Sequence, residues 1–292
     1  MLDFESLINL PTPLTEIFDE LFIQKEVRVF VKRDDLTHLH ISGNKYRKLK
    51  YNVKYAKENG IESLVTFGGA YSNHLAAFAE TCYQMQIKGT VIVRGDELNP
   101  ESNETLKRAH GLGIELVFVD RSSYRNKEEL ARKYAPNAMY VPEGGSNENA
   151  LPGVAELLEE QFYPDYICTA SGTGGTASGL LSNEKFEGEV VIIPVLKGGD
   201  FIKENIENLL KKPFPTRGNL FTEYHFGGYG KYNEELLEFI EGFELKHKVP
   251  LDQVYTGKMF FGVMDLIKKD FFAPNSTIFL LHTGGLQGKL KY

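Results

Sequence analysis

The chain of 292 residues is long enough for one large domain or two of ordinary size, and its 42% hydrophobic and 25% charged residues are typical of globular proteins. Its net charge of -7, without a sustained basic tract, argues against nucleic acid as a partner but leaves room for a small anion in a locally basic pocket. Cys82 and Cys168 are too few for a disulfide framework or a four-ligand zinc site, so we expect no metal and a reducing compartment. Because no apolar run approaches ~20 residues and the amino terminus lacks a signal-peptide pattern, we expect a cytoplasmic protein without membrane contact.

After a start containing Pro11 and Pro13, which we expect to be irregular, the chain alternates short apolar runs with segments of helical period. This alternation is typical of an α/β protein with mostly parallel sheets. The apolar runs are 27–31, 63–67, 90–93, 114–119, 139–141, 166–170, 190–196, 220–226 and 277–281. Helices are expected at 72–84, 101–110, 127–134, 153–161, 201–210, 234–246 and 258–269. The pattern restarts near residue 150, which favours two α/β blocks with a ligand cleft between them.

The segment 41–51 follows the first apolar run and opens another helical pattern, so we expect Lys45 at a junction where it can face a cleft. A lysine attacks aldehydes when burial or neighbouring cations destabilise its ammonium form, and Arg47, Lys48 and Lys50 are close in sequence. The competing interpretation is that the six Lys and Arg residues between 45 and 57 form one solvated helix face.

The loop 171–176, Ser-Gly-Thr-Gly-Gly-Thr, lies between an apolar run and an expected helix, a setting in which backbone N–H groups can hold an anion. No lysine occurs between Ser171 and Leu181, so the loop is not a nucleoside-triphosphate P-loop. The spacing of Gly172, Gly174 and Ala177 fits a dinucleotide fingerprint, but the acidic residue expected about 20 residues on is missing. Small and hydroxyl residues favour a single phosphate monoester over a dinucleotide or an ordinary glycine turn.

A second glycine turn, 68–74, also connects an expected strand to a helix. Ser72 or Asn73 can cap that helix, and either residue can bind a ligand as well.

Five segments together resemble the pyridoxal-phosphate enzymes of the 1-aminocyclopropane-1-carboxylate deaminase and D-cysteine desulfhydrase family: 43–45, 69–74, 171–176, 251–258 and 282–285. They occur in order over nearly the whole chain. The resemblance implies a tryptophan synthase β-like fold with two open, twisted, mostly parallel sheets flanked by helices. It also implies a larger cofactor lobe (1–45 and 151–292), a smaller mobile lobe (46–150), a homodimer and a small amino acid as substrate.

Carried over residue by residue, the resemblance implies that Lys45 binds pyridoxal 5'-phosphate covalently and that Asn73 hydrogen-bonds its phenolic oxygen. Ser72 would contact the substrate carboxylate or assist proton transfer. Two tyrosines, Tyr229 and Tyr255, would face the substrate. The 5'-phosphate would be held by Gly172, Thr173, Gly174, Gly175 and Thr176.

The resemblance also implies that Thr256 and Thr283 contact the cofactor, but the chain departs from the deaminase pattern at Thr256, where deaminases proper carry a glutamate that pairs with the pyridine nitrogen. Thr283 matches desulfhydrase-like members, in which its hydroxyl faces that nitrogen, and Gln253 replaces a usual proline. The resemblance therefore favours D-cysteine desulfhydrase-like α,β-elimination to pyruvate, ammonia and sulfide over ring opening of 1-aminocyclopropane-1-carboxylate.

Two functions of different classes also fit parts of the sequence. A nicotinamide-dependent oxidoreductase would use the spacing of Gly172 and Gly174, although the missing acidic residue disfavours it. A non-catalytic small-molecule binder would keep the phosphate loop but would not need Lys45.

Overall fold

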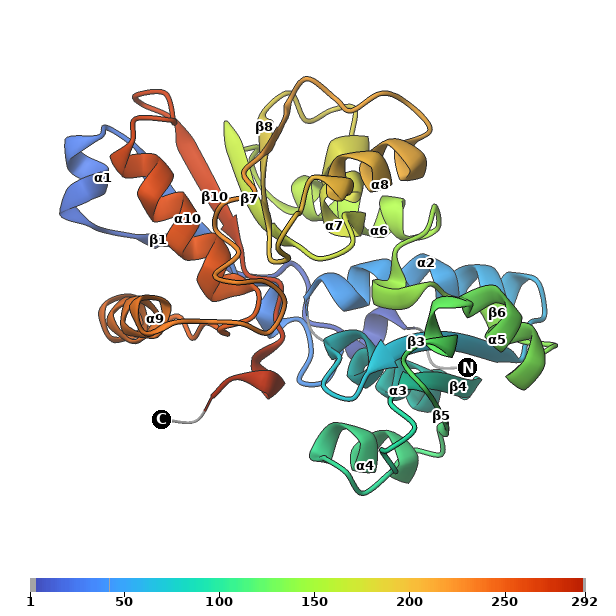
Figure 1. Ribbon diagram of the computed structural model, residues 1–292. Coiled ribbons are helices and arrows are strands. Elements are labelled where there is room, and N and C mark those ends of the chain that lie inside the picture. The colour runs from blue at the N-terminus through green and yellow to red at the C-terminus, as the bar shows by residue number, and fades with distance from the viewer. Residues whose placement is uncertain (1–3, 42, 291–292) are drawn as a thin grey trace.

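The computed structural model describes residues 4–41 and 43–290, so Ser42 in the segment around Lys45 lies outside the described residues. The described chain forms two lobes, each built on one sheet (Figure 1). The six-stranded sheet has the order β1 (Leu14–Ile17), β2 (Arg28–Lys32), β10 (Thr277–Leu281), β7 (Tyr166–Ser171), β8 (Glu189–Pro194), β9 (Gly218–Leu220). The four-stranded sheet has the order β5 (Glu115–Val119), β4 (Lys88–Arg94), β3 (Ser63–Gly69), β6 (Met139–Tyr140). Each strand pair is parallel except β1 with β2, which confirms the predicted α/β class.

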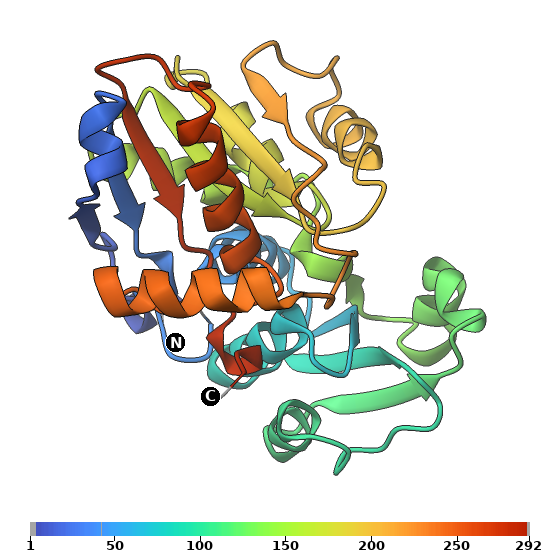
Figure 2. The same cartoon turned by 60° about the vertical axis from the view of Figure 1, so that its left-hand side comes forward.

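Helices cover both faces of the larger sheet because its central strands are apolar on both sides. In β8, Val191 and Ile193 pack into one cluster with α1 (Glu20–Gln24), α9 (Glu234–His247) and α10 (Thr256–Lys268). The alternate residues of β8, Val190 and Ile192, pack on the opposite face. The helices of that face are α7 (Gly175–Ser182) and α8 (Phe201–Leu210), and Figure 2 shows the two helix layers on either side of the sheet. Strands buried on both faces are the usual form of a parallel sheet.

The smaller sheet is covered in the same way. Leu64 and Val91 pack with α2 (Asn44–Glu58), α3 (Asn73–Met85) and α4 (Glu104–Gly111) on one face. Val65 and Ile92 pack with α5 (Lys127–Tyr134) on the other. The strands of this sheet all lie within 46–150, and those of the larger sheet lie outside that range. The expected lobe boundary at 45/46 cuts through α2, which begins at Asn44 and packs against both α3 and α6 (Ala150–Ala155).

Three expected elements differ from the structure. The start is not wholly irregular, because Leu14–Ile17 pairs antiparallel with β2 and α1 follows it. The apolar run 220–226 is strand only to Leu220; beyond Phe221 the chain leaves the sheet for a glycine-rich loop. The single helix expected at 153–161 is α6 followed by a 3-10 helix, Glu156–Glu160.

Two features are absent from residues 4–41 and 43–290. None of the helices in these ranges combines the length and apolar character that a bilayer crossing requires. The same residues contain no cluster of three or more His, Cys, Asp or Glu side chains that could hold a metal ion.

Candidate functional site

A cavity of about 400 Å³ lies between the two lobes. Its walls come from segments that follow the carboxyl ends of parallel strands: the turn after β3, the loop after β7 and the turn after β10. The start of α2 contributes Lys45 and Lys48, and further segments of both lobes contribute the rest of the lining. Ligands of open α/β sheets bind at this edge, so the topology itself favours a site here.

Lys45 lies in the first turn of α2, and the backbone before it is shaped for this placement. Gly43 has a φ of +61°, and a Cβ at this position would overlap the carbonyl oxygen of Thr283. The Gly43 N–H donates to the Asp34 carbonyl oxygen at 2.9 Å and to Thr37 Oγ1 at 2.8 Å. A residue with a side chain could not bring the start of α2 so close to the turn after β10.

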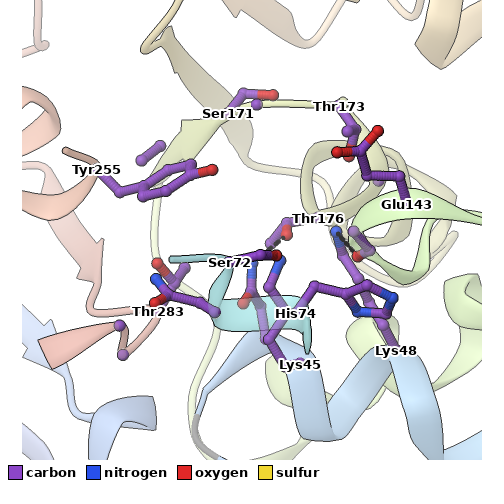
Figure 3. A pocket seen from close by; sticks show the side chains of 18 of the residues that line it. Lys45, Lys48, Ser72, His74, Glu143, Ser171, Thr173, Thr176, Tyr255 and Thr283 are labelled. Atoms are coloured by element: carbon purple, nitrogen blue, oxygen red, sulfur yellow. Dashed lines mark hydrogen bonds between the residues drawn. The ribbon is translucent and has the colours of Figure 1, made fainter. Parts of the chain in front are cut away.

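Burial lowers the pKa of Lys45 from its ordinary value of 10.5 to about 8, and the charge of Glu143 opposes this shift. A substantial fraction of the amine is therefore neutral near physiological pH and available as a nucleophile. Figure 3 shows Lys45 and Lys48 extending from α2 into the cavity, with Ser171 and Tyr255 on the far side.

The expectation that neighbouring cations crowd Lys45 is wrong for two of the three. Arg47 turns away and is buried in ion pairs with Asp34 and Glu160 at 2.6 and 2.7 Å. Lys50 pairs with Glu156 at 2.6 Å. The helical period of α2 sends these side chains to other faces, so burial, not cation crowding, is the main cause of the shift. The interpretation as one solvated basic face is also wrong, because Arg47 and Lys48 are buried.

The loop after β7 is shaped as an anion cradle at the amino end of α7. Gly174 caps the helix with a φ of +88°, and a Cβ on Gly175 would overlap Ser146 and lie 3.0 Å from Lys48 Nζ. Thr176 Oγ1 accepts a 2.8 Å hydrogen bond from Asn44 Nδ2, which ties the cradle to α2. No side chain caps α7, so the N–H groups of its first turn and the positive end of the helix dipole can both bind a phosphate.

Lys48 is a further residue of the cavity lining, which the sequence motifs did not assign to the site. Its side chain is buried, and its Nζ donates to the Gly144 carbonyl oxygen at 3.3 Å and to Ser146 Oγ at 3.2 Å. Among the residues that the structure describes, no carboxylate pairs with it. Burial and the charge of Lys45 lower the pKa of Lys48 well below its ordinary value. Its spacing of three residues from Lys45, which places both on one helix face, was the available sequence signal.

The turn after β3 brings three polar residues to the cavity. Ser72 caps α3, accepting a 3.3 Å hydrogen bond from the Leu75 N–H, so the capping prediction is confirmed. Asn73 lines the cavity, and Gly285 has no side chain where the Asn73 amide lies. His74 Nε2 is 2.8 Å from Thr66 Oγ1. Burial and the charges of Lys45 and Lys48 lower the pKa of His74 well below its ordinary value, so this imidazole is neutral.

Tyr229 and Tyr255 lie together on the larger lobe, with ring centroids 5.9 Å apart and planes at 74°. Both line the cavity, with Tyr229 about half exposed. Burial raises the pKa of Tyr255 well above its ordinary value, so its hydroxyl stays protonated and can donate a hydrogen bond. Thr283, at the carboxyl end of β10, lines the cavity on the same side as Tyr255 (Figure 3).

Of the 251–258 segment, Tyr255 lines the cavity, whereas Thr256 and Gln253 lie outside the lining. Thr256 is fully buried, and its hydroxyl donates to Asp252 Oδ2 at 2.7 Å. The hydroxyl thus helps to begin α10, and only Thr283 of the two threonines reaches the cavity. Gln253 donates from Nε2 to the Gly288 carbonyl oxygen at 2.9 Å, which anchors the segment after β10.

The structure therefore gathers nearly all the predicted site residues in one place. Thr256 is the exception among them. Those that line the cavity are Lys45, Ser72, Asn73, Gly172, Thr173, Gly174, Gly175, Thr176, Tyr229, Tyr255 and Thr283.

The cavity fits a phosphorylated aldehyde such as pyridoxal 5'-phosphate. Ser171 Oγ, beside the cradle, and His74 Nδ1 are buried without a hydrogen-bond partner among the described residues. Lys48 supplies a cation without a carboxylate, and Lys45 a partly neutral amine. Unsatisfied buried polar atoms and unpaired buried cations are costly, so their convergence on one cavity indicates a bound anionic ligand.

Comparisons with known proteins agree with this geometry. The family described as "Pyridoxal-phosphate dependent enzyme" matches residues 6–284. The chain is 32% identical to a putative 1-aminocyclopropane-1-carboxylate deaminase of Pyrococcus abyssi, over 98% of this chain and 93% of the relative. It is 28% identical to a bifunctional D-cysteine desulfhydrase/1-aminocyclopropane-1-carboxylate deaminase, mitochondrial, of Arabidopsis thaliana, over 97% of this chain and 78% of that protein.

The crystal structure of an ACC deaminase homologue superposes with a TM-score of 0.81 at 29% identity, covering 97% of this chain and 91% of that one. This similarity confirms the predicted tryptophan synthase β-like fold and pyridoxal 5'-phosphate as the cofactor. The chain belongs to the family of pyridoxal-phosphate-dependent enzymes, among relatives named for deaminase and desulfhydrase activities.

Proposed function

We propose that the enzyme catalyses α,β-elimination from a small D-amino acid, with D-cysteine as the test substrate, giving pyruvate, ammonia and sulfide. The observation that carries this proposal is the neutral hydroxyl of Thr283 on the Tyr255 side of the cavity. Of the Asp and Glu side chains described, Glu143 is the one that lines the cavity, and Figure 3 places it across from Thr283.

This arrangement bears on the electronics of the reaction. When bound, pyridoxal 5'-phosphate withdraws electrons from the substrate's α carbon, and it does so most strongly when a carboxylate holds its ring nitrogen protonated. A threonine hydroxyl supports that protonation much less. Elimination of thiolate after loss of the α proton tolerates weak electron withdrawal, whereas opening an unactivated cyclopropane without an α proton depends on it. Elimination is therefore favoured over ring opening, the second candidate reaction.

The chain's own side chains can perform the remaining tasks. Ser72 Oγ and the amino end of α3 can hold the substrate carboxylate. Lys45 Nζ, with its pKa near 8, can accept the α proton near neutral pH. The protonated Tyr255 hydroxyl can donate a hydrogen bond to the departing sulfur.

The test compares kcat/KM of the holoenzyme for D-cysteine and for 1-aminocyclopropane-1-carboxylate, with L-cysteine as the control for chirality. We expect D-cysteine to be the better substrate. Thr283→Glu, which places a carboxylate in the cavity, should shift the ratio towards the cyclopropane. Gly242→Glu serves as the control, because it adds a carboxylate on the exposed face of α9, outside the cavity lining, where a Cβ meets no other atom within 4 Å. Efficient turnover of the cyclopropane by the unmodified enzyme, with none of D-cysteine, would refute the proposal.

A further inference from the structure

Arg94 is a charged residue of the cavity that the proposed chemistry leaves unused. It is the last residue of β4 and pairs in register with Gly69, the last residue of β3. Its Nη2 lies 3.8 Å from the position a Cβ would take on Gly69, directly before the turn that carries Ser72. The guanidinium thus lies beside the place where the substrate carboxylate is expected, on the wall formed by the smaller lobe.

The Arg94 side chain is exposed at the edge of the cavity, and within residues 4–41 and 43–290 it has no hydrogen-bond acceptor and no carboxylate partner; the centroid of the Tyr124 ring lies 5.8 Å from its guanidinium carbon. The obvious counter-ion, Glu143, is already engaged by Lys127, whose Nζ is 2.6 Å from Glu143 Oε2. Lys127 Nζ also lies 5.3 Å from the centroid of the same Tyr124 ring. Lys127 therefore neutralises the carboxylate of Glu143, although Arg94 and Glu143 both line the cavity.

The charges of the cavity leave one cation unmatched. With the proposed function, the cofactor phosphate would be matched by Lys48 and the amino end of α7, and the substrate α-carboxylate by Ser72 and the amino end of α3. Lys45 would be taken by the cofactor. Arg94 remains, with its planar set of donors suited to a carboxylate or another oxyanion.

We propose that Arg94 binds a second anionic group on the side chain of the substrate, so that the natural substrates are amino acids carrying a carboxylate or a similar oxyanion beyond the α carbon. This inference rests on the proposed function for the position of the α-carboxylate. In this arrangement Arg94 of the smaller lobe determines the specificity for the substrate side chain, while the larger lobe holds the cofactor.

The experiment titrates the holoenzyme with D-alanine and D-aspartate, which differ by one carboxylate and carry no leaving group, and follows the cofactor absorption band to obtain each Kd. D-aspartate should bind on the order of 10-fold to 100-fold more tightly, the range expected for one charge-assisted bidentate contact. Arg94→Met should bring the two Kd values close together by weakening D-aspartate alone. Equal weakening of both amino acids would show that Arg94 binds the α-carboxylate and overturn the inference, as would an unchanged ratio.

Two further variants make the outcome specific. Lys127→Met leaves the carboxylate of Glu143 without its ion pair in the cavity wall, and this negative charge should also reduce the preference for D-aspartate. Arg125→Met removes an arginine outside the cavity lining and should keep the wild-type ratio. Equal affinity of the unmodified enzyme for both amino acids would overturn this inference while leaving D-cysteine elimination intact. Absent D-cysteine elimination with a retained D-aspartate preference would refute the proposed function alone.

Discussion

The buried cations on the two sides of helix α2 differ in whether a carboxylate neutralises them. On one side, Arg47 is fully buried and pairs with Asp34 and Glu160, and these charges raise its pKa against the effect of burial. On the other side, Lys45 and Lys48 enter the cavity without a carboxylate partner among the described residues, and burial lowers the pKa of both. A paired buried cation holds the fold together, whereas an unpaired one at a cavity indicates a ligand still to be bound.

The largest expected effect comes from removing the amine on the cavity side. Lys45→Met should abolish covalent attachment of the cofactor and lower kcat by at least roughly a thousandfold. The unfolding free energy of the apoprotein should not fall, because no ion pair of the described residues is lost. Absorption spectra, steady-state kinetics and denaturant unfolding check the three parts. A stable variant that retains kcat would contradict the assignment of Lys45.

The opposite pattern is expected on the paired side of the helix. Arg47→Met leaves the fully buried carboxylate of Asp34 without its guanidinium, which should cost about 3 to 5 kcal/mol of unfolding free energy. Lys54→Met is the control on the same helix. Lys54 is exposed and its Nζ is 4.0 Å from Glu58 Oε1, a weak surface ion pair, so the unfolding free energy should change by less than about 0.5 kcal/mol. Similar stability of the two variants would remove the basis of the comparison.

Substitution of Lys48 should weaken cofactor binding without lowering the unfolding free energy of the apoprotein. Lys48→Met removes a buried charge that has no carboxylate partner among the described residues, so the apoprotein should be as stable as the wild type or more stable. Cofactor affinity should fall by about 10-fold to 100-fold, the value of one charge-assisted hydrogen bond to phosphate. Equilibrium titration of the apoprotein with pyridoxal 5'-phosphate measures this loss. Unchanged affinity would place the phosphate away from Lys48.

A further prediction concerns the pH dependence of stability. In the folded apoprotein the pKa of Lys45 is about 8, below its ordinary value of 10.5, so folding disfavours the protonated form. The resulting destabilisation is fully present below pH 8 and is relieved as the pH rises from about 8 to 10.5. The unfolding free energy of the wild type should therefore rise relative to Lys45→Met across this window. A constant difference between the two proteins would show that the folded pKa is not lowered.

Much of the fold and of the site could be predicted because each depends on local signals. Alternating apolar runs and helical segments indicated the α/β class, and short motifs such as Ser72-Asn73 and Gly172–Thr176 lie at strand ends where parallel sheets place ligands. The expected homodimer stays a prediction, as does the individual role of each site residue.

Other features depend on contacts between distant segments, and sequence reasoning missed them. Side-chain direction within α2 separates Lys48 from Arg47, although the two are adjacent in the chain. Thr256 was assigned to the cofactor by its motif, but the cap formed with Asp252 holds its hydroxyl outside the cavity lining. The ion pair of Lys127 with Glu143 joins two segments of the cavity wall, and no local pattern indicates it.

Borohydride reduction of the holoenzyme, followed by peptide mapping, tests the central claim most directly. If the unpaired cations of α2 form the cofactor site, the reduced cofactor will be found on the peptide containing Lys45. Label on Lys48 would show that the two lysines of the cavity have exchanged roles. Label on Lys197, or on Lys258, which is buried with its Nζ 2.7 Å from the Gly228 carbonyl oxygen, would contradict the account.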